Sequence, residues 1–551
     1  MKNVFPQIKL NGLLGNALHR SAVNRLKTVD YDQLVEPFRL RNEADGAWRC
    51  EFWGKVVRSA ILTNHFVHDE ELAAIIQKTV KAIMATQSSD GCISSYPEHL
   101  QLSRWDIWGR KYVLLALLRY YDMVNPDENV KISCIRMLDH LISQIGDDKS
   151  TFTVYGEHGG LAASSILGAV VGVYRISREK RFLDFARRIV ASGCSVKHNI
   201  FDAVCSGIAP CDLGNGKAYE MTSCFQGLAE LHEFVPVPKY KEACEKYFSA
   251  VRTQELFITG TGGGRDRWGE YWDNGALKQT ENGYAGGLGE TCVTTTWMHY
   301  CERIADLNSD PTPFDEVERS LYNSILGAMS ADGSKWMHVN PTPLTGSGCK
   351  LAAGDQIGNN FGTPFGGHDC CRAQGPEALA LAAKLAVIVR EKSIDINLFE
   401  PLDVEINENI RIGISGNYPC TPNAEIRAFS TEAVTLRLRM PHFIKSVNLN
   451  GENLDIRPGD YLTLTRQWSA KDVLHMEFDF SIREISSPGT GEYTAFMSGP
   501  LVLAADSRGD VPEALISINY RGIQLTDYIT AGNKMCRENT LTVWFANNHL
   551  I

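Results

Sequence analysis

Over roughly the first 390 residues, apolar side chains recur every three to four positions, which is the spacing of amphipathic helices. The segment 69–91 shows this spacing and ends in a turn that contains glycine. The same pattern returns, between short polar connections, in segments 111–124, 130–146, 164–177, 180–193, 240–254, 314–333 and 376–389. We expect helical hairpins throughout this region. Because no repeat of fixed period runs along it, a closed toroid of helix pairs is favoured over an open solenoid.

The pattern changes near residue 393, where apolar and polar residues begin to alternate with a period of two. The alternating segments are 393–416, 433–456, 461–468, 473–482 and 538–546, and turn signals such as NG, PGD and SPGTG separate them. This pattern predicts a β-sandwich. The expected class is therefore mainly α with β, with a helical catalytic domain over 1–390 followed by a β-sandwich domain over 391–551.

Length and composition fit this division. A chain of 551 residues is too long for one ordinary core. The net charge of −10 argues against a nucleic-acid partner, and no apolar run is long enough to predict a membrane span. The N-terminal segment lacks the features of a signal peptide. The 15 cysteines are odd in number and scattered through helical segments, which favours reduced thiols and a cytoplasmic location.

Two cysteine-containing segments carry the candidate chemistry. Cys370 and Cys371 stand side by side in GGHDCCRAQGPEAL, at the mouth of a predicted helix. Glu290 and Cys292 lie in GLGETC, just before another helix. Three thiols and one carboxylate are a suitable tetrahedral set for zinc, although the spacing is not that of a zinc finger. The alternative is buried thiols at helix starts, with a glutamate favoured there by the helix dipole.

GETC followed about 80 residues later by a CC pair that opens a helix resembles glycoside hydrolase family 127, whose best-known members are β-L-arabinofuranosidases. Segments 84–95, 256–272 and 498–506 also resemble parts of that family, so the likeness covers most of the chain. The resemblance implies an (α/α)6 barrel followed by β-sandwich modules. It also implies a retaining glycosidase that acts on a β-L-arabinofuranoside or a related furanoside of plant cell-wall glycans.

The resemblance further implies individual roles. Glu290, Cys292, Cys370 and Cys371 fall on the zinc ligands, Cys370 on the nucleophile, and Glu270 on the general acid/base. A free thiol is only a few per cent thiolate at neutral pH, and zinc and a helix N-terminus both stabilise the thiolate. Cys370 would then attack the anomeric carbon, and Glu270 would protonate the leaving oxygen and later deprotonate water.

At some positions the chain departs from that family. Lys217 stands where the family has a histidine, and Arg110 and Lys111 lie near another such position. His338 stands where the family often has a tyrosine. Two fixed positive charges in place of histidines suggest an anionic sugar, such as a carboxylated furanose. The alternative is that these side chains pair with acids of the chain, such as Glu220 or Asp106.

Other residues are candidates for sugar contacts. His158 opens a predicted helix from a Gly-rich loop and is expected to line the cleft. Trp268 and Trp272 flank Glu270, where they are candidates for stacking on a sugar ring, although aromatic residues are more often part of the core.

The sequence also admits other functions on the same fold. One is a zinc hydrolase in which the metal activates water. Another is a non-catalytic carbohydrate-binding protein with a structural zinc, and a third is a lyase or an epimerase of acidic sugars. The sequence leaves open whether the chain forms a homodimer.

Overall fold

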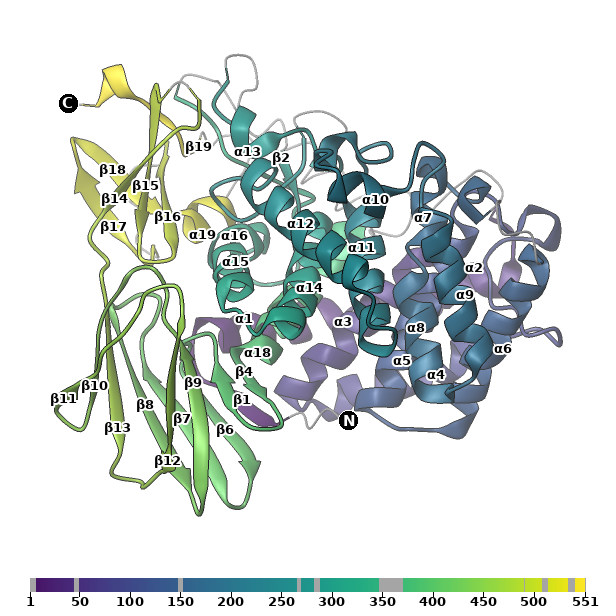
Figure 1. Ribbon diagram of the computed structural model, residues 1–551, viewed down its shortest axis with the longest axis horizontal. Coiled ribbons are helices and arrows are strands. Elements are labelled where there is room, and N and C mark those ends of the chain that lie inside the picture. Colours follow the sequence, from purple (N-terminus) through teal and green to yellow (C-terminus); the bar gives the residue numbers. More distant parts are fainter. Residues whose placement is uncertain are drawn as a thin grey trace.

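The computed structural model of the chain describes residues 6–43, 49–146, 152–264, 269–281, 288–345, 370–489, 491–507, 514–533 and 541–550. Helices occupy the N-terminal two thirds of the chain and strands occupy the rest (Figure 1). The predicted change from helical to alternating periodicity is therefore confirmed. The last long helix ends at Ala386.

Within the described residues, a closed ring of six inner helices forms the centre of the helical region. Each helix packs against the next, and the last packs against the first. In order they are α3 (Phe52–Val67), α5 (Asp106–Met123), α8 (Leu167–Ser177), α11 (Ala218–Phe234), α14 (Thr291–Asn308) and α18 (Cys370–Ala386). Most residues of this ring are buried on every side, which explains why α3 is a continuous buried run from Phe52 to Thr63.

Each inner helix is backed by an outer helix. The outer set is α4 (Glu70–Met84), α6 (Glu128–Ile145), α9 (Lys180–Ala191), α12 (Pro238–Gln254), α15 (Thr312–Ser320) and α1 (Leu13–Ser21). These helices are amphipathic: in α9, Phe182, Phe185 and Ile189 are buried while the opposite face meets solvent. The predicted (α/α)6 barrel is confirmed, and the N-terminal helix α1 completes it by packing on the last inner helix, α18.

Shorter helices join these elements: α2 (Tyr31–Leu40), α7 (Leu161–Ser164), α10 (Ile200–Cys205), α13 (Gly275–Lys278) and α16 (Leu326–Ala328). Among the described residues, the helical segment 158–177 is long and apolar enough to cross a membrane. However, 67% of its most apolar stretch is buried inside the protein. It behaves as a core segment of the barrel.

Two sheets follow the barrel and share a buried core (Figure 1). The seven-stranded sheet has the order β1 (Gln7–Leu10), β6 (Leu402–Asn407), β7 (Ile410–Gly416), β8 (Asn423–Ser430), β13 (Val473–Phe478), β10 (Ile444–Leu449) and β11 (Glu452–Asn453). The four-stranded sheet has the order β12 (Tyr461–Gln467), β9 (Ala433–Arg439), β5 (Ile394–Ile396) and β4 (Val387–Val389). The expectation of helix as far as residue 389 is thus wrong for its last three residues, which form β4.

A further sheet lies beyond these two. It comprises β14 (Arg483–Ser486), β15 (Tyr493–Ser498), β16 (Leu501–Asp506), β18 (Ile523–Asp527) and β17 (Ser517–Tyr520), with β19 (Leu541–Thr542) and β20 (Phe545–Ala546) at its side. Its short helix α19 (Tyr528–Asn533) packs against α16 of the barrel. The β region therefore contains more than one sandwich, and the predicted boundary at residue 390 stays a prediction.

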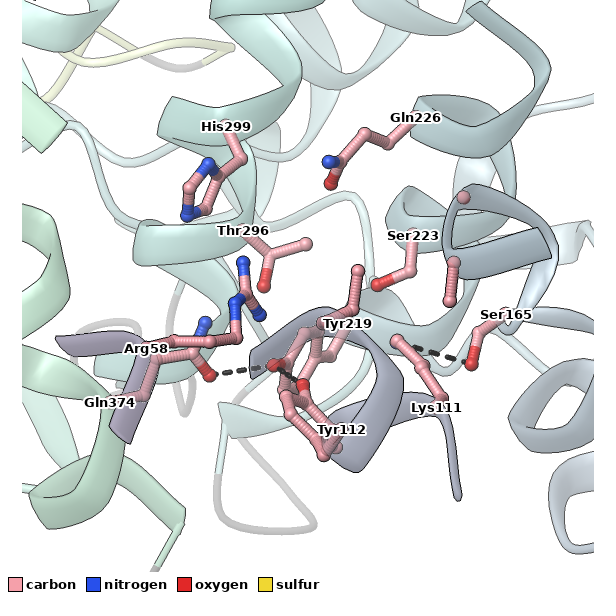
Figure 2. Close-up of a pocket in the computed structure, with 13 residues that line it drawn as sticks. Arg58, Lys111, Tyr112, Ser165, Tyr219, Ser223, Gln226, Thr296, His299 and Gln374 are labelled. Carbon is pink, nitrogen blue, oxygen red and sulfur yellow. Dashed lines mark hydrogen bonds between the residues drawn. The ribbon is translucent and has the colours of Figure 1, made fainter. Parts of the chain in front are cut away.

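The barrel has two further features, a short strand pair and an internal cavity. A short antiparallel pair, β2 (Leu288–Glu290) and β3 (Val339–Pro341), interrupts the helices and leads directly into α14. Inside the ring, inward-facing side chains from all six inner helices or their ends leave a small polar cavity, which Figure 2 shows.

Candidate active site

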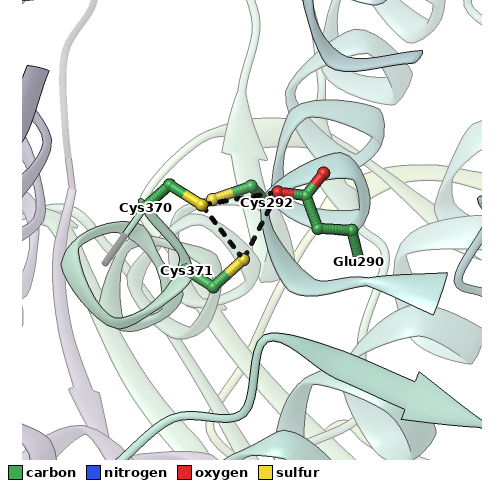
Figure 3. A group of neighbouring side chains, drawn as sticks. All are labelled: Glu290, Cys292, Cys370 and Cys371. Carbon is green, nitrogen blue, oxygen red and sulfur yellow. Dashed lines mark hydrogen bonds between the residues drawn. The ribbon is translucent and has the colours of Figure 1, made fainter. Parts of the chain in front are cut away.

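The three thiols and the carboxylate singled out in the sequence meet at one place (Figure 3). Glu290 ends β2, Cys292 lies in the first turn of α14, and Cys370 and Cys371 open α18. Cys370 Sγ lies 3.8 Å from Cys371 Sγ and 3.6 Å from Glu290 Oε1, and Cys371 Sγ lies 3.5 Å from that oxygen. All four donor atoms lie within 4.8 Å of one another.

Two glycines allow the backbone to present the glutamates. A Cβ on Gly289 would lie 2.2 Å from the side chain of Thr261, so only glycine lets β2 pack there and place Glu290. Gly269 has a φ of +74°, and a Cβ on it would lie 2.5 Å from the carbonyl oxygen of Leu288. The glycine before each glutamate is therefore a requirement of the local geometry.

The four-residue cluster fits a zinc ion. Zinc–sulfur bonds of about 2.3 Å in a tetrahedron place two sulfurs about 3.8 Å apart, which is the separation found for the adjacent cysteines. Glu290 is 2% exposed, and its Oε2 is buried without a hydrogen-bond partner, as expected of an atom reserved for another ligand. Three thiols and a carboxylate are soft and borderline donors of the kind that zinc binds.

The pKa values of the four acidic groups in this cluster shift in different directions. Hydrogen bonds from Cys292 and Cys371, with help from His338, hold the pKa of Cys370 well below the ordinary thiol value. Burial raises the pKa values of Cys292, Cys371 and Glu290. Cys370 also opens a helix, whose dipole favours an anion. Among the three thiols, Cys370 is thus the one that the protein itself prepares as a thiolate.

Glu270 lies beside this cluster and is held from two sides. Its Oε2 accepts a hydrogen bond from Lys217 Nζ at 2.5 Å, and its Oε1 lies 3.6 Å from His338 Nε2. Burial acts to raise the pKa of Glu270, but the neighbouring His338 and the charge of Lys217 outweigh burial and hold the pKa below its usual value. The backbone supports the arrangement, because Ala218 N–H donates to the Glu270 carbonyl at 3.0 Å.

His338 connects the two halves of the site. Its Nδ1 lies 3.8 Å from Cys370 Sγ, and its Nε2 lies 3.6 Å from Glu270 Oε1. Burial acts to lower the pKa of His338, yet the neighbouring Cys370 and Glu270 raise it well above the ordinary value. A single imidazole therefore contacts both the candidate nucleophile and the candidate acid/base. The sequence singled out His338 as a departure from the family, but gave no sign that it would stand between them.

The other predicted sugar contacts lie in different environments. His158 Nδ1 lies 3.3 Å from Tyr271 Oη, next to Glu270 in the chain, so it belongs to the neighbourhood of the site. Trp272 is 3% exposed and donates its indole N–H to Tyr247, which makes its ring part of the core. Trp268 lies outside the described residues.

The two predicted positive charges are already paired. Arg110 is 2% exposed, and its Nη2 lies 2.8 Å from Asp106 Oδ2. Lys217 is engaged with Glu270 and lies 4.0 Å from Glu220. Both side chains thus have carboxylate partners within the protein. This is the alternative to their binding an anionic sugar.

Lys55 is a member of the site that sequence reasoning missed. Its Nζ lies 3.8 Å from Cys292 Sγ and 3.2 Å from Glu51 Oε2, and its side chain is 1% exposed. The aromatic ring of Tyr219 lies below it, with the centroid 4.7 Å from Nζ. The available signal was a lysine within the otherwise apolar first turns of α3, 52–57, with a glutamate four residues earlier.

Comparisons with known proteins give a consistent result. The profile described as "Beta-L-arabinofuranosidase, GH127 catalytic domain" matches residues 11–384, and the corresponding middle-domain profile matches residues 393–480. A non-reducing end β-L-arabinofuranosidase of Bifidobacterium longum subsp. longum is 19% identical over 497 residues, covering 80% of this chain and 73% of that protein.

Solved structures agree in fold. A GH127 β-L-arabinofuranosidase from Geobacillus stearothermophilus T6 has a TM-score of 0.75 at 16% identity and covers 98% of this chain and 99% of its own. A second structure, described as a GH127 β-arabinofuranosidase, has a TM-score of 0.76 at 16% identity, with coverage of 99% and 97%. At this identity the likeness establishes the barrel and the β region that follows it.

Proposed function

Because this chain belongs to glycoside hydrolase family 127 and is a glycosidase, we propose that it releases β-L-arabinofuranose from glycans with net retention of configuration. Cys370 is the nucleophile and Glu270 is the acid/base in this proposal. The observation that carries it is the position of His338, which contacts Cys370 Sγ on one side and Glu270 Oε1 on the other. The two groups thus flank one space, as a double displacement requires.

In the first step, an electron pair on Cys370 Sγ attacks the anomeric carbon and the bond to the leaving oxygen breaks. Glu270 delivers a proton to that oxygen, and the sugar is left as a thioglycoside of Cys370. His338 is the nearby source of protons, because its pKa is raised well above the ordinary value and its Nε2 lies 3.6 Å from Glu270 Oε1. Lys217 holds the other carboxylate oxygen and fixes the orientation of the group.

In the second step, Glu270 acts as a base and takes a proton from water. The water oxygen attacks the anomeric carbon, the carbon–sulfur bond breaks, and its electron pair returns to Cys370 Sγ. The contacts of Glu270 with Lys217 and His338 favour the carboxylate form that this step needs. Two inversions at the anomeric carbon give net retention.

We propose that Glu290, Cys292, Cys370 and Cys371 hold a zinc ion. The separations of the sulfur and oxygen atoms and the unpartnered Glu290 Oε2 support this assignment. When bound, zinc would stabilise the thiolate form of Cys370. Four protein ligands leave no open position for a water molecule, so this set favours a thiolate nucleophile over a metal-activated water.

The sugar is proposed to be neutral. Lys217 is neutralised by Glu270, and Arg110 by Asp106, so neither offers an unpaired charge for a substrate carboxylate. The test compares p-nitrophenyl β-L-arabinofuranoside with its α anomer and with a p-nitrophenyl uronide. We expect turnover of the first compound alone, with the β anomer of arabinose formed first in the NMR spectrum. Turnover of the uronide alone would contradict a neutral sugar, and an α anomer as first product would contradict retention.

Lys55→Met is expected to weaken zinc binding by about 10- to 100-fold, the usual effect of losing a partner of a metal ligand. Three thiolates and a carboxylate carry more negative charge than a divalent ion cancels, and Lys55 supplies a buried cation beside Cys292 Sγ. The measurement is competition for zinc against a chelator of known affinity. Lys78→Met is the control, because Lys78 is an exposed residue of α4. Equal zinc retention in both variants would show that Lys55 serves packing only.

A further inference from the structure

The cavity at the centre of the barrel lies apart from the four-residue cluster and has no part in the proposed reaction. Its volume is about 20 Å³, enough for one small molecule or ion of about the size of water. Every inner helix or its end contributes to the lining. The polar lining residues are Arg58, Lys111, Tyr112, Ser165, Tyr219, Ser223, Gln226, Thr296, His299 and Gln374 (Figure 2).

Lys111 is the first unusual feature of this cavity. It is 3% exposed, and the structure gives its Nζ one hydrogen-bond partner, Ser165 Oγ at 3.2 Å. Within the described residues, no carboxylate oxygen lies within 4.0 Å of its ammonium group. Aromatic rings also surround it, the nearest of these being Trp108 with its centroid 4.1 Å away, and the Cys224 thiol acts on its charge at longer range. An ammonium group has three donors, so this buried charge is incompletely satisfied.

The carboxylates near the cavity lie outside its lining. Glu377 lies 3.0 Å from Arg58 Nη2 and 3.1 Å from His299 Nε2, and it also accepts from Arg119 at 2.5 Å. Glu220, the acid of α11 that faces Lys111 at longer range, lies 4.0 Å from Lys217, which is itself paired with Glu270. Among the described residues, the lining thus contains the bases Arg58 and Lys111 and no carboxylate.

A second buried group also lacks a partner. Thr296 is 2% exposed, and its Oγ1 is buried without a hydrogen bond. Figure 2 shows Thr296 in the middle of the lining, beside Arg58 and opposite Lys111. A hydroxyl can donate to an anion or to water, and a described lining that holds Arg58 and Lys111 but no carboxylate favours the anion.

We propose that this cavity binds one small monovalent anion, of the size and charge of chloride. The anion accepts hydrogen bonds from the Lys111 ammonium and the Thr296 hydroxyl, lies beside Arg58, and balances the positive charge of Lys111. It thereby ties α5 to α3 and α14 at the axis of the barrel. Burial lowers the pKa of Lys111 to about 7, and the bound anion favours its protonated form. The site is independent of the proposed glycosidase reaction.

The test is equilibrium dialysis of the full chain against labelled chloride, in buffer whose other salt is sodium gluconate. We expect one chloride per chain for the wild type, none for Lys111→Met, and unchanged binding for Lys78→Met, which removes an exposed lysine. Thr296→Val keeps the shape of the side chain and is expected to weaken binding by at least about tenfold, because it removes a hydrogen bond to a charged group.

Crystals grown in bromide locate the ion. An anomalous peak between Lys111 and Thr296 supports the proposal, and its loss in Thr296→Val or Lys111→Met crystals supports the roles of those side chains. A peak without anomalous signal would identify the occupant as water and overturn the proposal, as would bound chloride that survives in Lys111→Met. The Thr296→Val variant and the bromide map of the wild type decide the question even if Lys111→Met does not fold.

Discussion

Cys370→Ser is expected to lower kcat on p-nitrophenyl β-L-arabinofuranoside by at least about 1000-fold, because a serine hydroxyl at neutral pH is a far weaker nucleophile than a prepared thiolate. Cys370 is the thiol whose pKa the surrounding hydrogen bonds lower. The measurement is steady-state release of p-nitrophenol, with bound zinc quantified in the same samples. We expect reduced zinc content as well, because the substitution also removes a metal ligand.

Two comparisons separate the roles of Cys370. Cys205→Ser, which changes a half-buried thiol at the end of α10, should leave both turnover and zinc content unchanged. Cys371→Ser should lower zinc content to a similar extent as Cys370→Ser. Partial turnover in Cys370→Ser with zinc bound would contradict the nucleophile assignment and favour a metal-activated water.

Glu270→Gln is expected to lower kcat by about 100- to 10,000-fold for glycosides with poor leaving groups, since it removes proton transfer in both steps. The loss should be smaller for the first step with a 2,4-dinitrophenyl glycoside, whose leaving group needs no proton. The covalent intermediate then accumulates. Mass spectrometry of the quenched protein should find one arabinose on the peptide that contains Cys370 and Cys371, with the modification on Cys370.

Glu281→Gln provides the matched control, because Glu281 is an exposed glutamate on the same stretch of chain. It should retain wild-type turnover on both classes of glycoside. Azide should restore turnover of the dinitrophenyl substrate by Glu270→Gln, with a β-glycosyl azide as product, since azide needs no general base. An equal loss for good and poor leaving groups, with no rescue by azide, would reject the acid/base role of Glu270.

Periodicity predicted the architecture best where one face of an element meets solvent. The outer helices and the strands of the seven-stranded sheet bury one face and expose the other, so apolar residues mark them at the expected spacing. Inner helices such as α3 are buried all round, and strand β4 follows α18 without a turn. Neither leaves a periodic signal at its boundary, which is why the helix was expected to continue to residue 389.

The N-terminal strand shows a second limit of periodicity. Strand β1 is only four residues long, yet it pairs antiparallel with β6, from Gln7 opposite Glu405 to Leu10 opposite Leu402. The next element, α1, backs the last inner helix, α18. Both contacts join residues roughly 350 to 400 positions apart. Local pattern contains no information about partners at that distance.

The sequence by itself determined the division into barrel and β region, because periodicity reports which face of each element is buried. It also determined the four residues of the candidate metal site, because GETC and the CC pair are recognisable by residue type and spacing. Only the tertiary structure decided that His338 stands between Cys370 and Glu270, that Lys55 supports Cys292, and that Glu270 and Asp106 neutralise Lys217 and Arg110. The physical reason is that charged groups interact strongly only when they lie within a few ångströms of each other. The packing of helices that are far apart in the sequence sets those distances.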